Sequence, residues 1–206
     1  MGNAAKKRPL QARAAVRRRS ILEAALQSFT ELGFGASTVG DICKRSRAST
    51  GSVYHLFGSK EALAAELYLE GVAEYQRGFL AVLSAQPRAR EGLYAVTRYH
   101  LGWVREHPAW ARYLLQMRRA GFTAATEVHL SELNRDFGLG VGAWILPHVQ
   151  RHTLRRFAPD LFTSILLGPC QEFSRQWLAG RCQTDLDVAA RELGRAAWRV
   201  LAQTRE

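Results

Sequence analysis

The segment from Thr38 to Lys60, TVGDICKRSRASTGSVYHLFGSK, constrains the fold of this chain more than any other part of its 206 residues. Thr38 and Asp41 have the spacing of a capping box, in which two side chains and two backbone N–H groups bond reciprocally at a helix start. This signal predicts a helix that runs to about Ser46. Its apolar positions recur three and four residues apart, so we expect one buried face.

A second short helix is predicted directly after the first. Ser49 or Thr50 can cap its start, Val53 is its apolar anchor, and Gly58 permits the turn that ends it. A long helix then begins at Lys60. Two short helices joined by a tight turn are typical of a helix-turn-helix, whose second helix enters the major groove of DNA.

These residues resemble the TetR family of bacterial transcription regulators. The family signature ends in a tyrosine, one or two aromatic or histidine residues and then Phe-Gly-x-Lys-Glu, and residues 54–61 read YHLFGSKE. Residues 18–34 resemble the family's first helix and its glycine stop, and the similarity extends over roughly residues 15–75. The resemblance implies an all-α fold, in which an N-terminal three-helix DNA-binding domain joins through helix four to a C-terminal helical domain for ligand binding and dimerisation.

The turn between the two short helices departs from the family pattern. Residues 46–49 read SRAS, with Arg47 where the family often has glycine. Either Arg47 adopts a left-handed conformation, or the turn itself differs. Leu56 also stands where many members carry histidine or tyrosine, which would remove one phosphate contact.

We expect the second short helix and its surroundings to contact DNA. Thr50 and Ser52 would reach base edges or nearby phosphates, and the N-H groups at the helix starts would bind phosphate oxygens. By the resemblance, Tyr54 and Lys60 clamp the sugar-phosphate backbone with help from His55. A half-buried Tyr54 that seals the core, and an Arg47 that contacts only water, are the alternatives. The predicted DNA-contacting residues are Thr38, Arg47, Ser49, Thr50, Gly51, Ser52, Tyr54, His55 and Lys60.

Charge supports a nucleic-acid partner. The net charge is +11, and residues 1–60 hold eleven Lys or Arg against three Asp or Glu. A basic surface of this kind favours binding to phosphates, although an arginine-rich composition extends beyond the first 75 residues. The segment 1–13 lacks an apolar run and is predicted to be a disordered basic arm, neither signal peptide nor anchor. Three cysteines without metal-ligand spacing (Cys43, Cys170, Cys182) indicate reduced thiols and a cytoplasmic protein.

The remaining periodic segments are all predicted to be helical. The domains expected are a DNA-binding domain over 14–75 and a ligand-binding and dimerisation domain over 76–206. Helices are expected over 14–32, 60–83, 90–106 and 109–120, from about residue 126 with a bend or break at Gly138, Gly140, Gly142 and Pro147, from about 159 to 178, and from a cap at Thr184 onward.

A small molecule is expected to bind among the middle helices, as in most members of the family. Aromatic side chains at helical spacing are more often core than ligand contacts, so each assignment has that alternative. The candidate lining is Tyr99, His100, Trp103, Trp110, Tyr113, Met117, Phe122 and Trp144. Nearby arginines hint at an anionic ligand, or simply face solvent: Arg98, Arg105, Arg112, Arg118 and Arg119.

Two-fold dimers match palindromic operators, and the resemblance assigns dimerisation to the last two helices. Their candidate interface residues are Phe162, Ile165, Leu166, Phe173, Trp177, Leu193, Trp198 and Val200, some of which would be core within one chain. The function expected is a homodimeric repressor released from its operator by a small-molecule ligand, with co-repression by the ligand as an alternative.

An enzyme and a membrane-associated protein are the two alternative classes. His148 and His152 are four residues apart and could hold a metal in an enzyme, but no third ligand stands in register, so we expect neither metal nor cofactor. A basic protein on anionic membrane surfaces is the second alternative, since Arg13, Arg17, Arg18 and Arg19 lie beside apolar residues. The longest apolar run, residues 139–146, is too short to span a bilayer.

Overall fold

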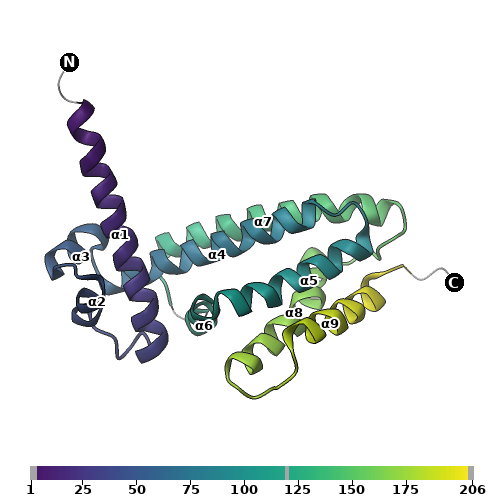
Figure 1. Ribbon diagram of the computed structural model, residues 1–206. Helices are drawn as coiled ribbons and strands as arrows, with labels where there is room; N and C mark the ends of the chain where they lie inside the picture. Colours follow the sequence, from purple (N-terminus) through teal and green to yellow (C-terminus); the bar gives the residue numbers. More distant parts are fainter. Residues whose placement is uncertain (1–3, 119–120, 204–206) are drawn as a thin grey trace.

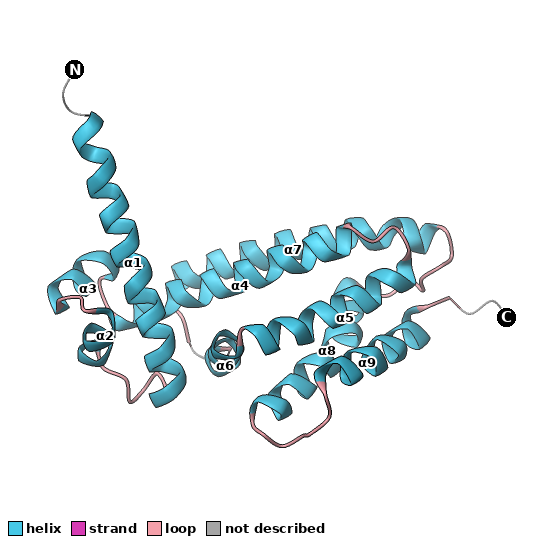
Figure 2. Ribbon diagram, viewed as in Figure 1, coloured by secondary structure: helices cyan, strands magenta, loops and turns pink. Residues whose placement is uncertain are grey.

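A computed structural model describes residues 4–118 and 121–203. Regular structure in these two ranges is helical (Figure 2), apart from an isolated antiparallel bridge between Leu154 and Ala202. The all-α fold class is therefore confirmed. The helices are α1 (Ala4–Leu32), α2 (Val39–Ser46), α3 (Thr50–Phe57), α4 (Lys60–Ser84), α5 (Ala89–Glu106), α6 (Pro108–Met117), α7 (Ala124–Gln150), α8 (Pro159–Leu178) and α9 (Leu186–Leu201).

The molecule consists of a small head and an elongated body. Helices α1, α2 and α3 gather at one end, and α4 leads from them into the body, where α7 lies along it (Figure 1). Helix α5 packs against α4, α8 and α9, so the last two helices form the side of the body away from α7.

The head core is built from apolar faces that the sequence periodicity predicts. Ile21 and Phe29 of α1, Ile42 of α2 and Val53 of α3 are each at most 1% exposed and meet the start of α4. Helix α6 also contributes to this cluster, although it lies far along the sequence. The head is consequently packed onto the body through α6 as well as connected to it through α4.

Helix α1 begins earlier than predicted. It starts at Ala4, so residues 4–13, expected to be a disordered arm, are helical, and Figure 1 shows this part of α1 extending beyond the head. Alanine, lysine, arginine and glutamine favour helix, and extending an existing helix avoids the cost of nucleation. Residues 1–3 of the predicted arm lie outside the described residues.

Helix α7 is continuous where a bend or break was predicted. It runs unbroken through the three glycines, of which Gly140 lies against α4: a Cβ added there would lie 2.9 Å from Leu80. Pro147 falls in the last turn, where only one intrahelical hydrogen bond is lost. Gly140 therefore permits close packing of α7 on α4, whereas a Cβ added at Gly138 or Gly142 would meet no atom within 4 Å.

One other helix boundary was wrongly predicted, and a second falls outside the described residues. Helix α6 ends at Met117, and the predicted end at residues 119–120 lies outside the described residues. Helix α9 is capped by Asp185, whose carboxylate accepts from the N–H groups of Asp187 and Val188, in place of Thr184. The predicted domain boundary at residues 75 and 76 falls inside α4 and stays a prediction.

Candidate nucleic-acid interface and ligand cavity

The capping box at the start of α2 is confirmed. Thr38 Oγ1 accepts from the Asp41 N–H (3.2 Å), and Asp41 Oδ2 accepts from the Thr38 N–H (3.0 Å) and hydroxyl (2.6 Å). The hydrogen bonds from Thr38 lower the pKa of the Asp41 carboxyl. Both partners are local, so this feature could be predicted from four residues of sequence.

The turn between α2 and α3 contains a left-handed arginine. Arg47 has φ 55° and ψ 27°, which settles the choice left open by the sequence in favour of a non-glycine residue in the left-handed region. The Ser46 hydroxyl donates to the Ile42 carbonyl and accepts from the Ala48 N–H, which holds the chain on both sides of Arg47. The Arg47 side chain is exposed.

Helix α3 presents the outer face that the sequence predicted. Ser49 caps it by accepting from the Ser52 N–H (3.2 Å), and Val53 and Phe57 point into the head core. Thr50, Gly51, Tyr54 and His55 are exposed, whereas Ser52 is half-buried with its hydroxyl bonded to that of Ser49. At 49% exposure, Tyr54 lies outside the core, contrary to the alternative in which it seals the head.

Lys60 has a structural role that the sequence did not reveal. Its ammonium donates to the carbonyls of Phe34 and Ser37 (2.9 Å each) and lies 4.4 Å from the centre of the Phe34 ring. Lys60 thereby holds the loop between α1 and α2. Both carbonyls are more than twenty residues away in sequence, so no local pattern indicates these bonds. An ammonium has three donors, which leaves the predicted phosphate contact possible as an additional one.

The basic side chains described in α1, α2 and the turn after α2 fall into two groups. Arg18 pairs with Glu66, Arg19 with Glu23 and Glu70, and Arg45 with Glu31, so these charges are neutralised within the protein. In the described part of the chain, Arg13, Arg17, Lys44 and Arg47 form no ion pair. Arg13, Arg17 and Arg47 line one groove of about 480 Å³ between α1 and the turn. Sequence reasoning did not connect α1 with the turn.

This division weakens the membrane alternative. Two of its four arginines, Arg18 and Arg19, bind α4 carboxylates and do not form a free basic face. Within the described residues, no helix has the length and apolar content needed to cross a bilayer.

The body contains a cavity of about 400 Å³ between α4, α5, α6, α7 and α8. Two of the predicted ligand-binding residues, His100 and Trp103, line it. The further lining residues are Tyr68, Val72, Tyr75, Val104, Ala111, Leu114, Leu115, Arg118, Leu130, Asn134, Gln171 and Ser174.

A hydrogen-bonded group lies in the cavity wall. The Tyr75 hydroxyl lies 2.7 Å from Nδ1 of His100, and the Ser174 hydroxyl lies 3.2 Å from its Nε2. Burial lowers the pKa of His100 to about 4, so the imidazole is neutral at pH 7. Trp103 turns its indole N–H to Glu74 (2.9 Å) and presents apolar ring surface to the cavity.

The other six predicted ligand residues lie elsewhere. Tyr113 and Met117 belong to the head core, where the Tyr113 hydroxyl donates to the Ala64 carbonyl (2.6 Å). Tyr99 donates to the Tyr75 carbonyl, Trp110 packs on Gly71, and Trp144 donates to the Gln86 carbonyl at the far end of the body. Aromatic spacing marks a buried helix face but does not say which neighbour covers it.

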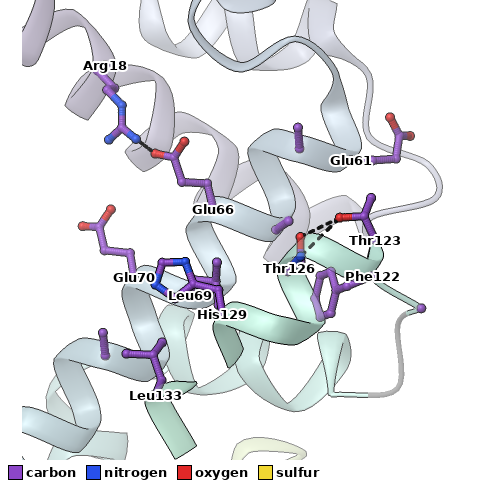
Figure 3. Close-up of a pocket in the computed structure, with 14 residues that line it drawn as sticks. Arg18, Glu61, Glu66, Leu69, Glu70, Phe122, Thr123, Thr126, His129 and Leu133 are labelled. Atoms are coloured by element: carbon purple, nitrogen blue, oxygen red, sulfur yellow. Dashed lines mark hydrogen bonds and ion pairs between the residues drawn. The ribbon is translucent and has the colours of Figure 1, made fainter. Parts of the chain in front are cut away.

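Phe122 lines a different and more open groove of about 780 Å³ between α1, α4 and α7. Figure 3 shows Arg18 of α1 reaching Glu66 of α4 at one edge, with Glu70 and His129 nearby and the bonded pair Thr123 and Thr126 toward Phe122.

Of the arginines in the predicted ligand region, only Arg118 lines the body cavity among those described. Arg105 pairs with Asp187, and Arg98 and Arg112 are exposed. Arg119 lies outside the described residues.

The predicted dimer residues divide between core and surface. Phe162 and Leu166 are 2% and 3% exposed within the chain's own core, which for these two favours the alternative that the sequence left open, core within one chain. Val200 is 44% exposed on α9. Five others are only partly covered within the chain: Ile165, Phe173, Trp177, Leu193 and Trp198. Those five and Val200 stay predictions.

The predicted pair His148 and His152 does not form one helix face. Helix α7 ends at Gln150, His148 is buried beside the Trp144 ring, and His152 follows in the left-handed region at φ 54°. No cluster of three or more metal-ligating side chains occurs in the part of the chain that the structure describes.

Fold and site together define a class: a helix-turn-helix protein with an exposed reading helix, an electropositive head and a separate helical body that encloses a cavity. Residues 21–67 match the family model described as "Bacterial regulatory proteins, tetR family". This match spans the helix-turn-helix with parts of α1 and α4, and it indicates a DNA-binding transcription regulator of this type. Regulators of the family bind DNA operators, typically as dimers with small-molecule effectors.

Most of the chain is similar to several regulators at low sequence identity. It is 22% identical over 151 residues, 73% of this chain and 78% of the relative, to the uncharacterized HTH-type transcriptional regulator YhgD of Bacillus subtilis (strain 168). A TetR family transcription regulator from Marinobacter aquaeolei VT8 has a TM-score of 0.78 at 20% identity, covering 94% of this chain and all of that one. The regulator FadR of Bacillus subtilis, solved with stearoyl-CoA, has a TM-score of 0.75 at 18% identity, covering 87% and 96%.

Proposed function

We propose that this protein is a dimeric repressor that binds a palindromic operator through α3 and releases it when a small molecule enters the body cavity. In each protomer, α3 enters the major groove, where Thr50 and Ser52 read base edges and Tyr54 and His55 contact the backbone. The exposure of Thr50, Tyr54 and His55 supports these roles, and the free Arg13, Arg17 and Arg47 offer further phosphate contacts.

One observation carries the link between ligand and DNA: helix α6 belongs both to the cavity wall and to the head core. Ala111 and Leu114 line the cavity, whereas Tyr113 and Met117, on the neighbouring face of the same helix, are buried in the head core. A ligand that displaces α6 must therefore repack the head against the body. Closely packed cores respond to such shifts by moving whole elements.

The second contact of α6 strengthens this argument. The Trp110 ring packs so closely on α4 that a Cβ added at Gly71 would lie 2.5 Å from it, and Tyr113 bonds to the Ala64 carbonyl of α4. Because α4 carries the head, a movement of α6 changes the separation of the two reading helices in a dimer. Major-groove faces recur about 34–36 Å apart along DNA, so altered separation lowers operator affinity.

The partly exposed apolar side chains of α8 and α9 support dimerisation through these helices. Val200 and Val188 on α9 and Leu161 on α8 are exposed, beside the partly covered Ile165 and Trp198. All three cysteines are free thiols, which fits a protein of the reducing cytoplasm.

Selection of the full-length protein on random duplexes tests DNA reading. We expect an inverted repeat to be enriched over scrambled competitor. Thr50→Ala and Ser52→Ala should change the selected sequence, whereas Tyr54→Phe should weaken binding to all sequences similarly. Arg98→Ala, an exposed charge on α5, serves as the control. No preference for any duplex would refute the assignment of α3, and specific retention on anionic vesicles would favour the membrane alternative.

A cavity-filling variant tests the coupling through α6. Ala111→Leu fills part of the cavity with a larger side chain and should weaken operator binding without any ligand. Ala125→Leu, at an exposed position of α7, should leave operator binding unchanged. Unchanged operator affinity in a folded Ala111→Leu protein would contradict release by α6. Tighter binding would instead favour co-repression.

A further inference from the structure

The polar side chains that line the body cavity can all donate hydrogen bonds. Among the described residues that line it, no Asp or Glu is present and Arg118 carries the only formal charge, since His100 is buried and neutral. Arg118 is exposed, so it lies at the mouth, whereas His100 is 7% exposed and lies inside.

The amide groups near the mouth are oriented by their neighbours. Arg118 Nη1 donates to Gln171 Oε1 (3.2 Å), and because a guanidinium has no acceptor, the atom of Gln171 that faces it must be the oxygen. Gln76 donates to Asn134 Oδ1 (2.9 Å). Gln171 and Asn134 keep both N–H donors of their NH₂ groups and one lone pair on each oxygen, and Arg118 keeps its remaining N–H groups. Donors therefore outnumber acceptors here.

The hydrogen-bonded group of Tyr75, His100 and Ser174 also has one unused donor, whichever tautomer His100 adopts. Tyr75, neutral His100 and Ser174 together carry three polar hydrogens, and the two bonds that join them use two. The third hydrogen, on either the Ser174 or the Tyr75 hydroxyl, has no acceptor among the described residues. Ser174 and Gln171 are three residues apart on α8, so both project from one helix face.

Much of the remaining lining is apolar. Val72 of α4, Leu114 of α6 and Leu130 of α7 line it together with the Tyr68 ring. A cavity of about 400 Å³ holds roughly thirteen water-sized groups, since one water occupies about 30 Å³. Its size and its mixed polar and apolar lining thus fit a small molecule with a polar end and an apolar body.

We propose that the effector is an amphipathic monocarboxylate, whose carboxylate accepts hydrogen bonds from Arg118, Gln171 and the inner hydroxyl, and whose apolar body lies against α4, α6 and α7. The proposal rests on the function proposed above, because it names the ligand of the same cavity. A carboxylate offers acceptor lone pairs only and pairs with a guanidinium by charge-assisted hydrogen bonds. A cation would face Arg118 without a counter-charge, and a purely apolar ligand would leave buried donors unpaired.

Three matched probes test the charge preference in the absence of DNA. Decanoate has about twelve non-hydrogen atoms, which is close to the number of water-sized groups that the body cavity holds. Methyl decanoate and decylammonium keep its chain but remove or reverse its charge. Calorimetry with the full-length protein, below the micelle-forming concentration, should show decanoate binding at least tenfold tighter than either. Equal binding of the ester, tighter binding of the ammonium, or no binding of decanoate would overturn the proposal.

Arg118→Met tests the residue that carries the charge. It keeps the apolar stem and should weaken decanoate binding about tenfold or more, as expected for a hydrogen bond to a charged group. Arg112→Met, an exposed arginine of the same helix outside the cavity, should bind decanoate like the unmodified chain. Unchanged affinity in Arg118→Met, with its melting temperature preserved, would refute the assignment.

The two proposals fail separately. If the protein selects an operator but does not prefer decanoate over the other two probes, only the proposed ligand class is overturned. Decanoate binding without any duplex preference overturns the regulator and leaves the ligand class standing.

Discussion

Replacing Arg47 by glycine is expected to stabilise the protein and weaken its hold on DNA. At φ 55° and ψ 27°, Arg47 occupies the left-handed region, which costs a residue with a Cβ about 1–2 kcal/mol and glycine almost nothing. Glycine loses more chain entropy on folding, which offsets about 0.5–1 kcal/mol. The Arg47 side chain has no ion pair or hydrogen bond in the described residues, so nothing further is lost.

The free energy of unfolding should therefore rise by about 0.5–1 kcal/mol in Arg47→Gly. For a chain of this size, 1 kcal/mol corresponds to roughly 2–4 °C in melting temperature, so we expect an increase of about 2 °C. Arg47→Ala is the matched control, because it removes the same charge but keeps a Cβ in the left-handed region. It should show no such gain.

DNA binding should respond to the charge and not to the strain. If Arg47 contacts one phosphate, both variants should reduce the slope of log affinity against log salt concentration by about 0.9 per protomer, hence about 2 per dimer. Titrations of a selected operator at several salt concentrations measure this slope. Equal stabilisation by alanine would refute the strain argument, and an unchanged slope in both variants would refute the phosphate contact.

Three further predictions concern the packing of head and body. Lys60→Met removes two charged hydrogen bonds to the loop between α1 and α2, so urea denaturation should show a loss of about 2 kcal/mol, and unchanged stability would contradict the structural role of this ammonium. The pKa of His100, about 4 in the folded state, lies below its ordinary 6.5. Burial of the neutral ring therefore contributes fully to the free energy of unfolding above pH 6.5, and this contribution falls at lower pH because the unfolded chain takes up the proton. Between pH 7 and pH 5 this loss is about 2 kcal/mol, and a His100→Gln protein that loses as much would refute it. Gly71→Ala places a Cβ 2.5 Å from the Trp110 ring and should cost about 1–3 kcal/mol, whereas Gly102→Ala, in open space on α5, should stabilise by up to about 1 kcal/mol in thermal unfolding.

The head was predictable because its signals are local. Thr38 and Asp41 meet across three residues, and Ser49 caps α3 within one turn, so four-residue patterns suffice to place both short helices. The choice at Arg47 was open in the sequence, because a turn residue other than glycine enters the left-handed region only where its surroundings hold it there.

The cavity was less predictable because its wall is assembled from five helices. His100 and Trp103 were identified, but Tyr113 proved to be a head-core residue and the donors of α8 were missed. Apolar burial has no direction, so an aromatic stripe indicates that a helix face is covered without indicating which helix covers it.

By itself, the sequence determined that the chain is helical, that residues 38–60 form a helix-turn-helix, and that the positive charge is concentrated at the N-terminal end. The tertiary structure alone decided which arginines are free to meet phosphates, that Lys60 holds a loop, and that α6 joins the cavity to the head. The physical reason is range: caps, turns and periodicity act within a few residues, whereas ion pairs and packed faces depend on partners that only the fold brings together.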